Sequence, residues 1–259
     1  MKPLAMIGLV LLIAGCTPAP STVERFPTSG RVDYQLGGAW QPPDDVTIVA
    51  RDRTDPPLPG VYSICYINGF QTQPQEASFW LEEHPDLLLR DAAGDPRVDP
   101  GWPDEMALDT STSESREDLV AIMDEWIRGC ADDGYQAVEF DNLDSYSRFD
   151  GLTLDDNVAF ATLLVAAVHA LGLDAGQKNS TELGSRGRDD IGFDFAVSEE
   201  CFVYDECATY SEVYGEKVID IEYDDTELDG LCDYDRLPLL TIVRDRELTP
   251  GGTFWGCSD

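Results

Sequence analysis

Acidic side chains lie where several predicted strands end, and paired carboxylates are the groups that hydrolyse glycosidic bonds. Asp141 follows the apolar run at residues 137–140, and Glu199 follows the run at residues 193–197. In such a pair one carboxylate is ionised to attack the anomeric carbon, and the other is protonated to donate to the leaving oxygen. Mutual repulsion and partial burial would separate their pKa values. With 51 acidic residues in the chain, some carboxylates also fall at strand ends by chance.

Further polar and aromatic residues are predicted near the same strand ends. They are Asp33, Tyr66, Asp109, Glu139, Asn142, Asp144, Tyr146, Lys178, Asn179, Glu222 and Tyr223. The carboxylates would form an acidic groove that attracts a cationic ligand. The tyrosines would stack on sugar rings or cover amines, or simply pack the rim. Lys178 would hold a neighbouring carboxylate ionised, or form a structural ion pair.

These residues need a scaffold of alternating strands and helices. Strand-like runs are predicted at residues 33–36, 46–51, 61–67, 106–109, 137–140, 174–177, 193–197 and 217–223. Helices with one apolar stripe are predicted at residues 115–133 and 153–171, each followed by glycine. Eight strands alternating with helices predict an α/β fold, a single (β/α)8 TIM-type barrel over residues 32–259. A doubly wound open sheet is the alternative.

The N-terminus has the features of an export signal. Lys2 precedes an apolar run over residues 4–14 that is too short to span a bilayer as a helix. The sequence Ile13-Ala14-Gly15-Cys16 resembles a bacterial lipobox, which implies cleavage after residue 15 and lipidation of Cys16. Residues 16–31 would then be a flexible tether. We expect an exported protein, lipid-anchored to the periplasmic or extracellular face of the bacterial envelope; the alternative is a plain signal with a coincidental cysteine.

Six cysteines remain after Cys16, an even number that fits disulfides in an exported protein. They allow 15 pairings. Chain proximity favours Cys201–Cys207, Cys232–Cys257 would close a C-terminal extension, and Cys65–Cys130 remains. A zinc site is the competing interpretation, but the chain has two histidines and no close pair of cysteines with metal-ligand spacing.

The charge and motifs exclude several functions. The formal net charge of −34 argues against nucleic acid as a partner, because phosphate binding needs clustered Lys and Arg. It also argues against direct adhesion to anionic lipid headgroups. The sequence contains neither a GxSxG elbow nor a phosphate-binding P-loop. We expect a monomer that needs no cofactor.

One motif resembles a known family. Glu139-Phe140-Asp141-Asn142-Leu143-Asp144-Ser145-Tyr146 resembles the E-x-D-N-x-D-x-Y signature of glycoside hydrolase family 114, the endo-α-1,4-polygalactosaminidases. Weaker matches follow in the family's order: Tyr34-Gln35-Leu36-Gly37-Gly38, Cys65-Tyr66-Ile67, residues 172–179, residues 193–207 and Ile221-Glu222-Tyr223. The resemblance covers roughly residues 32–225.

The resemblance implies a barrel enzyme that hydrolyses α-1,4-linked galactosamine polymers, in biofilm polysaccharide turnover or processing. It also implies retention of configuration, with Asp141 as nucleophile and Glu199 as general acid/base. The sequence itself does not assign these two roles. Ser198 stands where the family has Asn. A non-catalytic carbohydrate-binding barrel and a hydrolase of a different glycan remain alternatives. Residues after about 229, including 239–244, lie beyond the resemblance and are expected to form the C-terminal extension.

Overall fold

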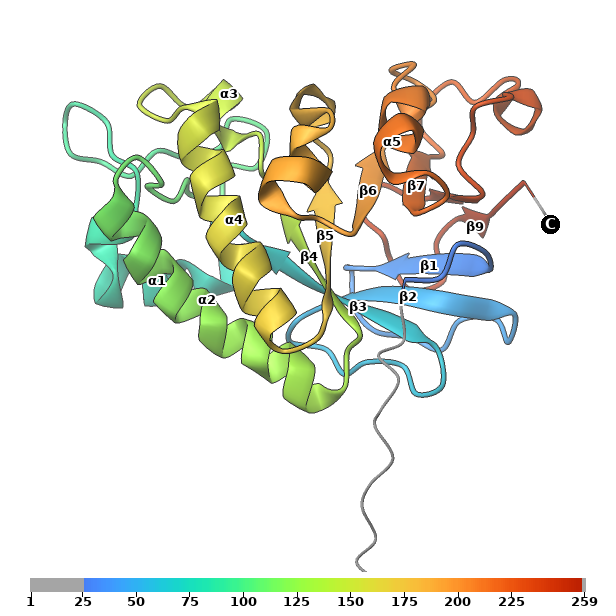
Figure 1. Ribbon diagram of the computed structural model, residues 1–259, viewed down its shortest axis with the longest axis horizontal. Helices are drawn as coiled ribbons and strands as arrows, with labels where there is room; N and C mark the ends of the chain where they lie inside the picture. The colour runs from blue at the N-terminus through green and yellow to red at the C-terminus, as the bar shows by residue number, and fades with distance from the viewer. Residues whose placement is uncertain (1–25, 258–259) are drawn as a thin grey trace, which may run out of the picture.

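The computed structural model describes residues 26–257, which form a nearly closed barrel (Figure 1). In this part of the chain eight parallel strands follow one another in sequence order, and a ninth pairs antiparallel with the eighth. The strands are β1 (Arg31–Gln35), β2 (Val46–Asp52), β3 (Tyr62–Asn68), β4 (Ala137–Asp141), β5 (Asp174–Lys178), β6 (Phe195–Glu199), β7 (Val218–Tyr223), β8 (Leu240–Arg244) and β9 (Phe254–Trp255). The predicted α/β barrel is confirmed.

Helices cover the barrel unevenly. They are α1 (Ala77–Glu83), α2 (Ser113–Asp133), α3 (Ser145–Arg148), α4 (Leu154–Ala170) and α5 (Cys207–Tyr214), with shorter turns η1 (Pro74–Glu76), η2 (Pro85–Leu87), η3 (Thr181–Leu183), η4 (Gly187–Ile191) and η5 (Leu231–Asp233). Figure 1 shows the two long helices, α2 and α4, side by side. No helix within residues 26–257 is long and apolar enough to cross a membrane.

The two long helices begin where the sequence supplies a hydroxyl cap. Thr112 accepts a hydrogen bond from the Ser115 backbone N–H at the start of α2, and Thr153 forms a capping box with Asp156 at the start of α4. Gly134 ends α2 in the left-handed conformation, which glycine adopts without strain. Both predicted helices therefore lie within two residues of the expected bounds.

Strand alternation divides the core into two layers. One layer fills the barrel interior, and the other lies between the strands and helices. Phe26 closes the interior layer: its ring stacks on Phe195 with centroids 4.3 Å apart. A side chain at Gly176 would collide with the Phe195 ring, so this close packing requires glycine. Phe26 belongs to the segment expected as tether, so the folded part begins before residue 32. The signal peptide, Cys16 and residues 17–25 lie outside the described residues.

Two strand predictions were wrong. Residues 106–109 do not join the barrel but form isolated antiparallel bridges within the long β3–α2 connection, where their apolar side chains are buried. The eighth barrel strand is instead β8, which lies in the segment expected as an extension. Its five residues are all buried, as in a strand covered on both faces. The runs before Asp141 and Glu199 are the fifth and seventh of the predicted strands. In the structure they are the fourth and sixth barrel strands, β4 and β6.

The three disulfides join the three expected pairs. They are Cys65–Cys130, Cys201–Cys207 and Cys232–Cys257. The first ties β3 to α2 behind the barrel wall, and the second closes the loop that follows β6. The third ties η5 to the segment after β9, so it encloses β8 instead of closing a separate extension.

The barrel closes between β1 and β8 through a buried arginine, since no ladder joins these two described strands. Arg244 donates to Asp33 Oδ1 at 2.6 Å and to the Tyr34 carbonyl oxygen. It also donates to the Thr253 carbonyl at 2.8 Å, next to β9. The Arg244 side chain is 1% exposed, so these partners replace all of its water.

Arg244→Met should therefore lower the free energy of unfolding by about 3–5 kcal/mol, because Asp33 would be left buried without its cation. Urea denaturation with intact disulfides measures this loss. The control is Arg128→Met, which breaks an exposed pair with Asp124 on α2 and should cost at most about 1 kcal/mol. Equal losses in the two variants would contradict the role of Arg244 in closure.

Candidate active site

Side chains from five consecutive strands converge at the carboxyl end of the barrel. Tyr66 (β3), Asp141 (β4), Lys178 (β5), Glu199 (β6) and Tyr223 (β7) line one cavity of about 590 Å³. Each points inward because it has the same parity along its strand as the residues that fill the barrel interior. The shared rim of a barrel brings these distant parts of the sequence together.

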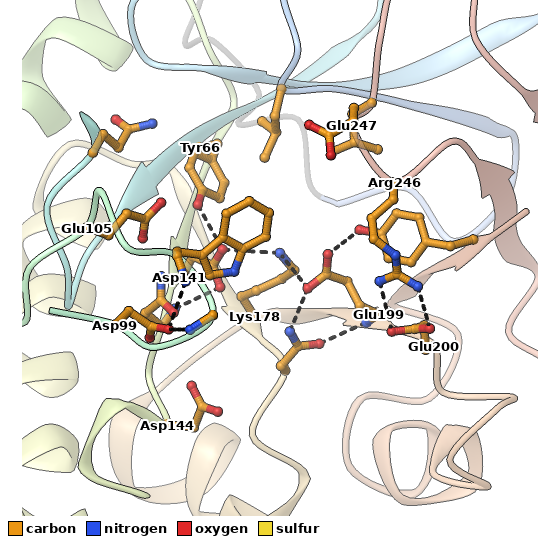
Figure 2. A pocket seen from close by; sticks show the side chains of 18 of the residues that line it. Tyr66, Asp99, Glu105, Asp141, Asp144, Lys178, Glu199, Glu200, Arg246 and Glu247 are labelled. Atoms are coloured by element: carbon orange, nitrogen blue, oxygen red, sulfur yellow. Dashed lines mark hydrogen bonds and ion pairs between the residues drawn. The ribbon is translucent and has the colours of Figure 1, made fainter. Parts of the chain in front are cut away.

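Lys178 lies at the centre of this group (Figure 2). Its Nζ is 3.3 Å from Asp141 Oδ2 and 3.3 Å from Glu199 Oε2. Glu139 lies one inward-facing position below Asp141, and its Oε1 is 3.8 Å from the same nitrogen. The Lys178 side chain is only 2% exposed. One buried ammonium therefore holds three carboxylates that would otherwise repel one another.

Asp141 and Glu199, the two carboxylates that reach the cavity, also accept hydrogen bonds from neighbouring groups. Asp141 accepts hydrogen bonds from the Tyr66 hydroxyl at 2.8 Å and from the Asn142 backbone N–H at 2.7 Å. Glu199 accepts from Asn179 Nδ2 at 2.9 Å and from the Tyr223 hydroxyl. Both carboxylates keep part of their surface open to the cavity, with side-chain exposures of 19% and 28%. They are thus fixed in place and accessible to a ligand.

Burial and neighbouring charges shift the pKa values of Glu199 and Glu139 in opposite directions. Burial raises the pKa of Glu199, but the Lys178 charge and the donors from Tyr223 and Asn179 outweigh it, so that pKa lies below its ordinary value. Burial raises the pKa of Glu139 to about 7, although Lys178 and the Tyr34 hydroxyl act in the opposite direction. Burial lowers the pKa of Lys178, but its carboxylate neighbours reverse this and raise it, so the ammonium stays charged.

A second group of charges flanks Asp141. Arg148 on α3 bonds to Asp99 Oδ2 at 2.9 Å and to Asp144 Oδ1 at 2.6 Å. Glu105 lies beside them on the β3–α2 connection, with exposed Trp102 three residues earlier on the cavity wall. Sequence reasoning missed Asp99, Trp102, Glu105 and Arg148. Three of them come from a long connection whose path no strand pattern predicts, and their acidic or aromatic type was the only signal.

The opposite side of the cavity carries Glu200 and Arg246. Arg246 bridges Glu200 at 3.0 Å and Asp225 at 2.8 Å, and its guanidinium lies 4.4 Å from the centre of the Tyr223 ring. Figure 2 shows these side chains beyond Glu199, on the side away from Glu105. Arg246 follows β8, so it was missed together with that strand.

The structure brings together only some of the predicted site residues. Those on the cavity are Asp141, Glu199, Tyr66, Asn142, Asp144, Lys178, Asn179 and Tyr223. Five others do not line it. Asp33 bonds to Arg244 at the closing seam, Asp109 accepts from the Ser111 backbone, and Tyr146 donates to Glu182. Glu139 is buried below Lys178, and Glu222 faces away from the interior.

Glu222 shows why a strand-end position is not sufficient. Its neighbours Ile221 and Tyr223 face the interior, so Glu222 points to the outer side of β7 and accepts from the Phe202 backbone N–H at 2.7 Å. Asp220 has the same parity and accepts from Ser198 Oγ at 2.9 Å. Ser198 thus faces outward and does not line the cavity.

Within residues 26–257, one group of potential metal ligands lies close together: Cys201, Cys207 and Asp220. Its two sulfurs are joined in a disulfide, so they offer no thiolates. The donor set does not fit a metal in this state.

The sequence matches glycoside-hydrolase family GH114 over residues 14–259. The crystal structure of Aspergillus fumigatus Ega3 in complex with galactosamine is similar with a TM-score of 0.72 and 22% identity, over 91% of this chain and 99% of that one. The glycoside hydrolase domain of PelA from Pseudomonas aeruginosa gives a TM-score of 0.58 and 14% identity, over 86% and 97% of the two chains. A search of curated protein sequences found no match.

Removal of the central ammonium should destabilise the barrel in a pH-dependent way. Lys178→Met should lower the free energy of unfolding by about 3–5 kcal/mol at pH 8, where the uncovered carboxylates are charged. The loss should be smaller at pH 5, because the folded state then takes up protons on these groups. Urea denaturation at both pH values measures it.

Lys217→Met is the matched control, since no ion pair of Lys217 is found among the described residues. It should change stability little at either pH. A Lys178→Met loss of the same size at pH 5 and pH 8 would show that Lys178 acts through packing and not through its charge.

Proposed function

The chain belongs to glycoside-hydrolase family GH114, and from that membership we propose that it is an endo-acting hydrolase of α-1,4-linked galactosamine-containing polysaccharide. Asp141 is the nucleophile and Glu199 the general acid/base. The observation that carries this proposal is the pairing of both carboxylates with the single Lys178 ammonium on the rim of the barrel. The barrel and the family make the protein a glycoside hydrolase; its substrate and residue roles are the proposal.

The spacing of the pair favours retention of configuration. Each carboxylate places one oxygen 3.3 Å from Lys178 Nζ, so these two oxygens lie at most twice that distance apart. Retaining enzymes hold their carboxyl groups about 5–5.5 Å apart, whereas inverting enzymes need about 6.5–9.5 Å to admit a water molecule. This bound applies to the two oxygens that contact Lys178, and it accommodates the separation found in retaining enzymes.

The reaction then proceeds in two steps. Asp141 Oδ attacks the anomeric carbon while the protonated Glu199 carboxyl donates its proton to the leaving glycosidic oxygen, which gives a glycosyl ester on Asp141. Glu199, now ionised, takes a proton from water, whose oxygen attacks the anomeric carbon and releases Asp141.

Lys178 couples these two steps. Formation of the ester removes the negative charge of Asp141, so the ammonium then faces an ionised Glu199 as its one remaining charged partner on the cavity surface. This favours the carboxylate form of Glu199 when it must act as a base.

The charge of the cavity supports a cationic substrate. Its lining includes seven carboxylates (Asp99, Glu105, Asp141, Asp144, Glu199, Glu200 and Glu247) but three cations (Arg148, Lys178 and Arg246). An excess of one sign attracts ligands of the other. The solved relative Ega3 is in complex with galactosamine, which is a cationic sugar when its amine is protonated.

The cellular setting is part of the same proposal. The lipobox-like sequence before Cys16 supports export and lipid anchoring to a bacterial envelope. Three disulfides fit an oxidising compartment outside the cytosol. From that place the enzyme would act on extracellular or periplasmic amino-sugar polymer, including biofilm matrix.

Removal of either carboxylate should greatly slow the cleavage of deacetylated α-1,4-galactosamine oligomers. Glu199→Gln should lower kcat by about 10²–10⁴-fold, and Asp141→Asn by at least as much, because no ester can form. Mass spectrometry of oligomer lengths over time measures both rates. Asp150→Asn, a change of the same kind at an exposed position, should cleave at the wild-type rate. Variants as active as wild type would refute the assignment, and intact oligomers from every protein would favour a different glycan.

The acidity of Glu199 should set the pH dependence. The free enzyme needs this carboxyl protonated, so kcat/KM should fall as pH rises past its pKa, which lies below the ordinary value. Tyr223→Phe removes one donor that lowers this pKa, so the falling limb should move to higher pH. Initial rates between pH 3 and 8 test this. A limb that stays in place would show that Tyr223 does not tune Glu199.

A further inference from the structure

The chemistry of a 2-amino sugar limits where its amine can be recognised. The nitrogen is attached to the carbon next to the anomeric carbon. When Asp141 attacks the anomeric carbon, the ammonium group of the same sugar unit must therefore lie near Asp141. A group that recognises this ammonium has to be an accessible anion on the same part of the cavity wall.

Most carboxylates near Asp141 already have a cationic partner. Asp99 and Asp144 share Arg148 at 2.9 and 2.6 Å. Glu199 is 3.3 Å from Lys178. Glu139 is fully buried, and the cavity lining does not include it.

Glu105 differs from all of these. It lines the cavity, yet no Lys or Arg nitrogen of the described residues lies within 4.0 Å of its carboxylate. Its Oε2 accepts one hydrogen bond, 3.0 Å long, from Asn68 Nδ2. Its Oε1 has no hydrogen-bond partner among the described residues and is not enclosed by protein. The carboxylate thus keeps one oxygen for a ligand.

The position of Glu105 is fixed relative to Asp141. Asn68 lies opposite Asp141 in the β3–β4 ladder. The side-chain oxygen of Asn68, Oδ1, accepts from Asn142 Nδ2 at 3.0 Å and from the Gln71 backbone N–H at 3.1 Å. Its amide nitrogen is therefore turned towards Glu105. Figure 2 shows Glu105 above Asp99 and beside Asp141.

We infer that Glu105 binds the ammonium group of the galactosamine unit attacked by Asp141 and thereby selects deacetylated over acetylated sugar. This inference rests on the proposed function for its substrate. An ammonium at Oε1 would supply the cation that Glu105 lacks, whereas an N-acetyl group would bring a neutral amide to a negative site.

The charge environment favours the neutral form of Glu105 until a cation binds beside it. Burial, together with the charges of Asp141 and Asp99, raises the pKa of Glu105 to about 7. The Asn68 hydrogen bond and Arg148 offset these effects only in part. A bound ammonium would reverse the shift by stabilising the ionised form.

The test compares Glu105→Gln with Asp104→Asn. Gln keeps an oxygen that accepts from Asn68 and removes the charge. Asp104 is the exposed preceding residue outside the cavity lining, so its variant controls for the loss of one negative charge near the site. We expect Glu105→Gln to lower kcat/KM on fully deacetylated oligomers about 10- to 100-fold, mainly through KM, with little change on N-acetylated oligomers. Asp104→Asn should resemble wild type on both.

Binding separates this inference from the proposed function. In the Glu199→Gln background, Glu105→Gln should weaken binding of deacetylated oligomers by a similar factor in calorimetry. Preserved, Glu105-dependent binding without any cleavage by wild type would refute the proposed function and support the role of Glu105. Equal loss on both oligomers, no loss, or no binding of deacetylated oligomers by the Glu199→Gln protein would overturn that role.

Discussion

Three carboxylates meet inside the barrel because a single ammonium, that of Lys178, compensates their charge. Asp141 and Glu199 can face the same cavity at short range only with this cation between them. Burial of a lone Lys would itself be costly, so the carboxylates and the ammonium stabilise one another. The pKa values follow from this arrangement. The pKa of Glu199 lies below its ordinary value, whereas that of Glu139, which is deeper and farther from Nζ, is raised. The barrel supplies the geometry, and the ion cluster makes it usable for two-carboxylate chemistry.

The ion pairs inside the cavity say more about where a ligand binds than the net charge of the whole chain does. The formal charge of −34 indicates a cationic partner but does not locate it. In the cavity, Arg148 and Arg246 neutralise carboxylates on opposite sides of the central cluster, while Glu105 and Glu247 form no ion pair among the described residues. Of these two, Glu105 lies beside Asp141 (Figure 2), where it can accept a positive group of a ligand. Recognition and bond cleavage can therefore depend on neighbouring but different carboxylates.

The sequence predicts the parts of this molecule that local pattern determines. Apolar stripes and caps mark α2 and α4, buried runs mark seven of the eight barrel strands, and strand ends mark Asp141, Lys178 and Glu199. Local pattern fails where a residue's role depends on distant partners. The run at residues 106–109 has the composition of a strand but forms only isolated bridges outside the barrel, whereas β8 pairs with β7. Glu222 lies at a strand end but has outward parity, and Glu105 and Arg148 reach the cavity through irregular segments that no periodicity describes.

We propose that Asp141 and Glu199 act as a closely spaced, retaining pair. Proton NMR of the first reducing ends released from deacetylated α-1,4-galactosamine oligomers tests it most directly, before mutarotation mixes the anomers. We expect the α anomer to appear first, because two successive displacements at the same carbon retain its configuration. Initial appearance of the β anomer would show a single displacement by water and would rule out Asp141 as the nucleophile.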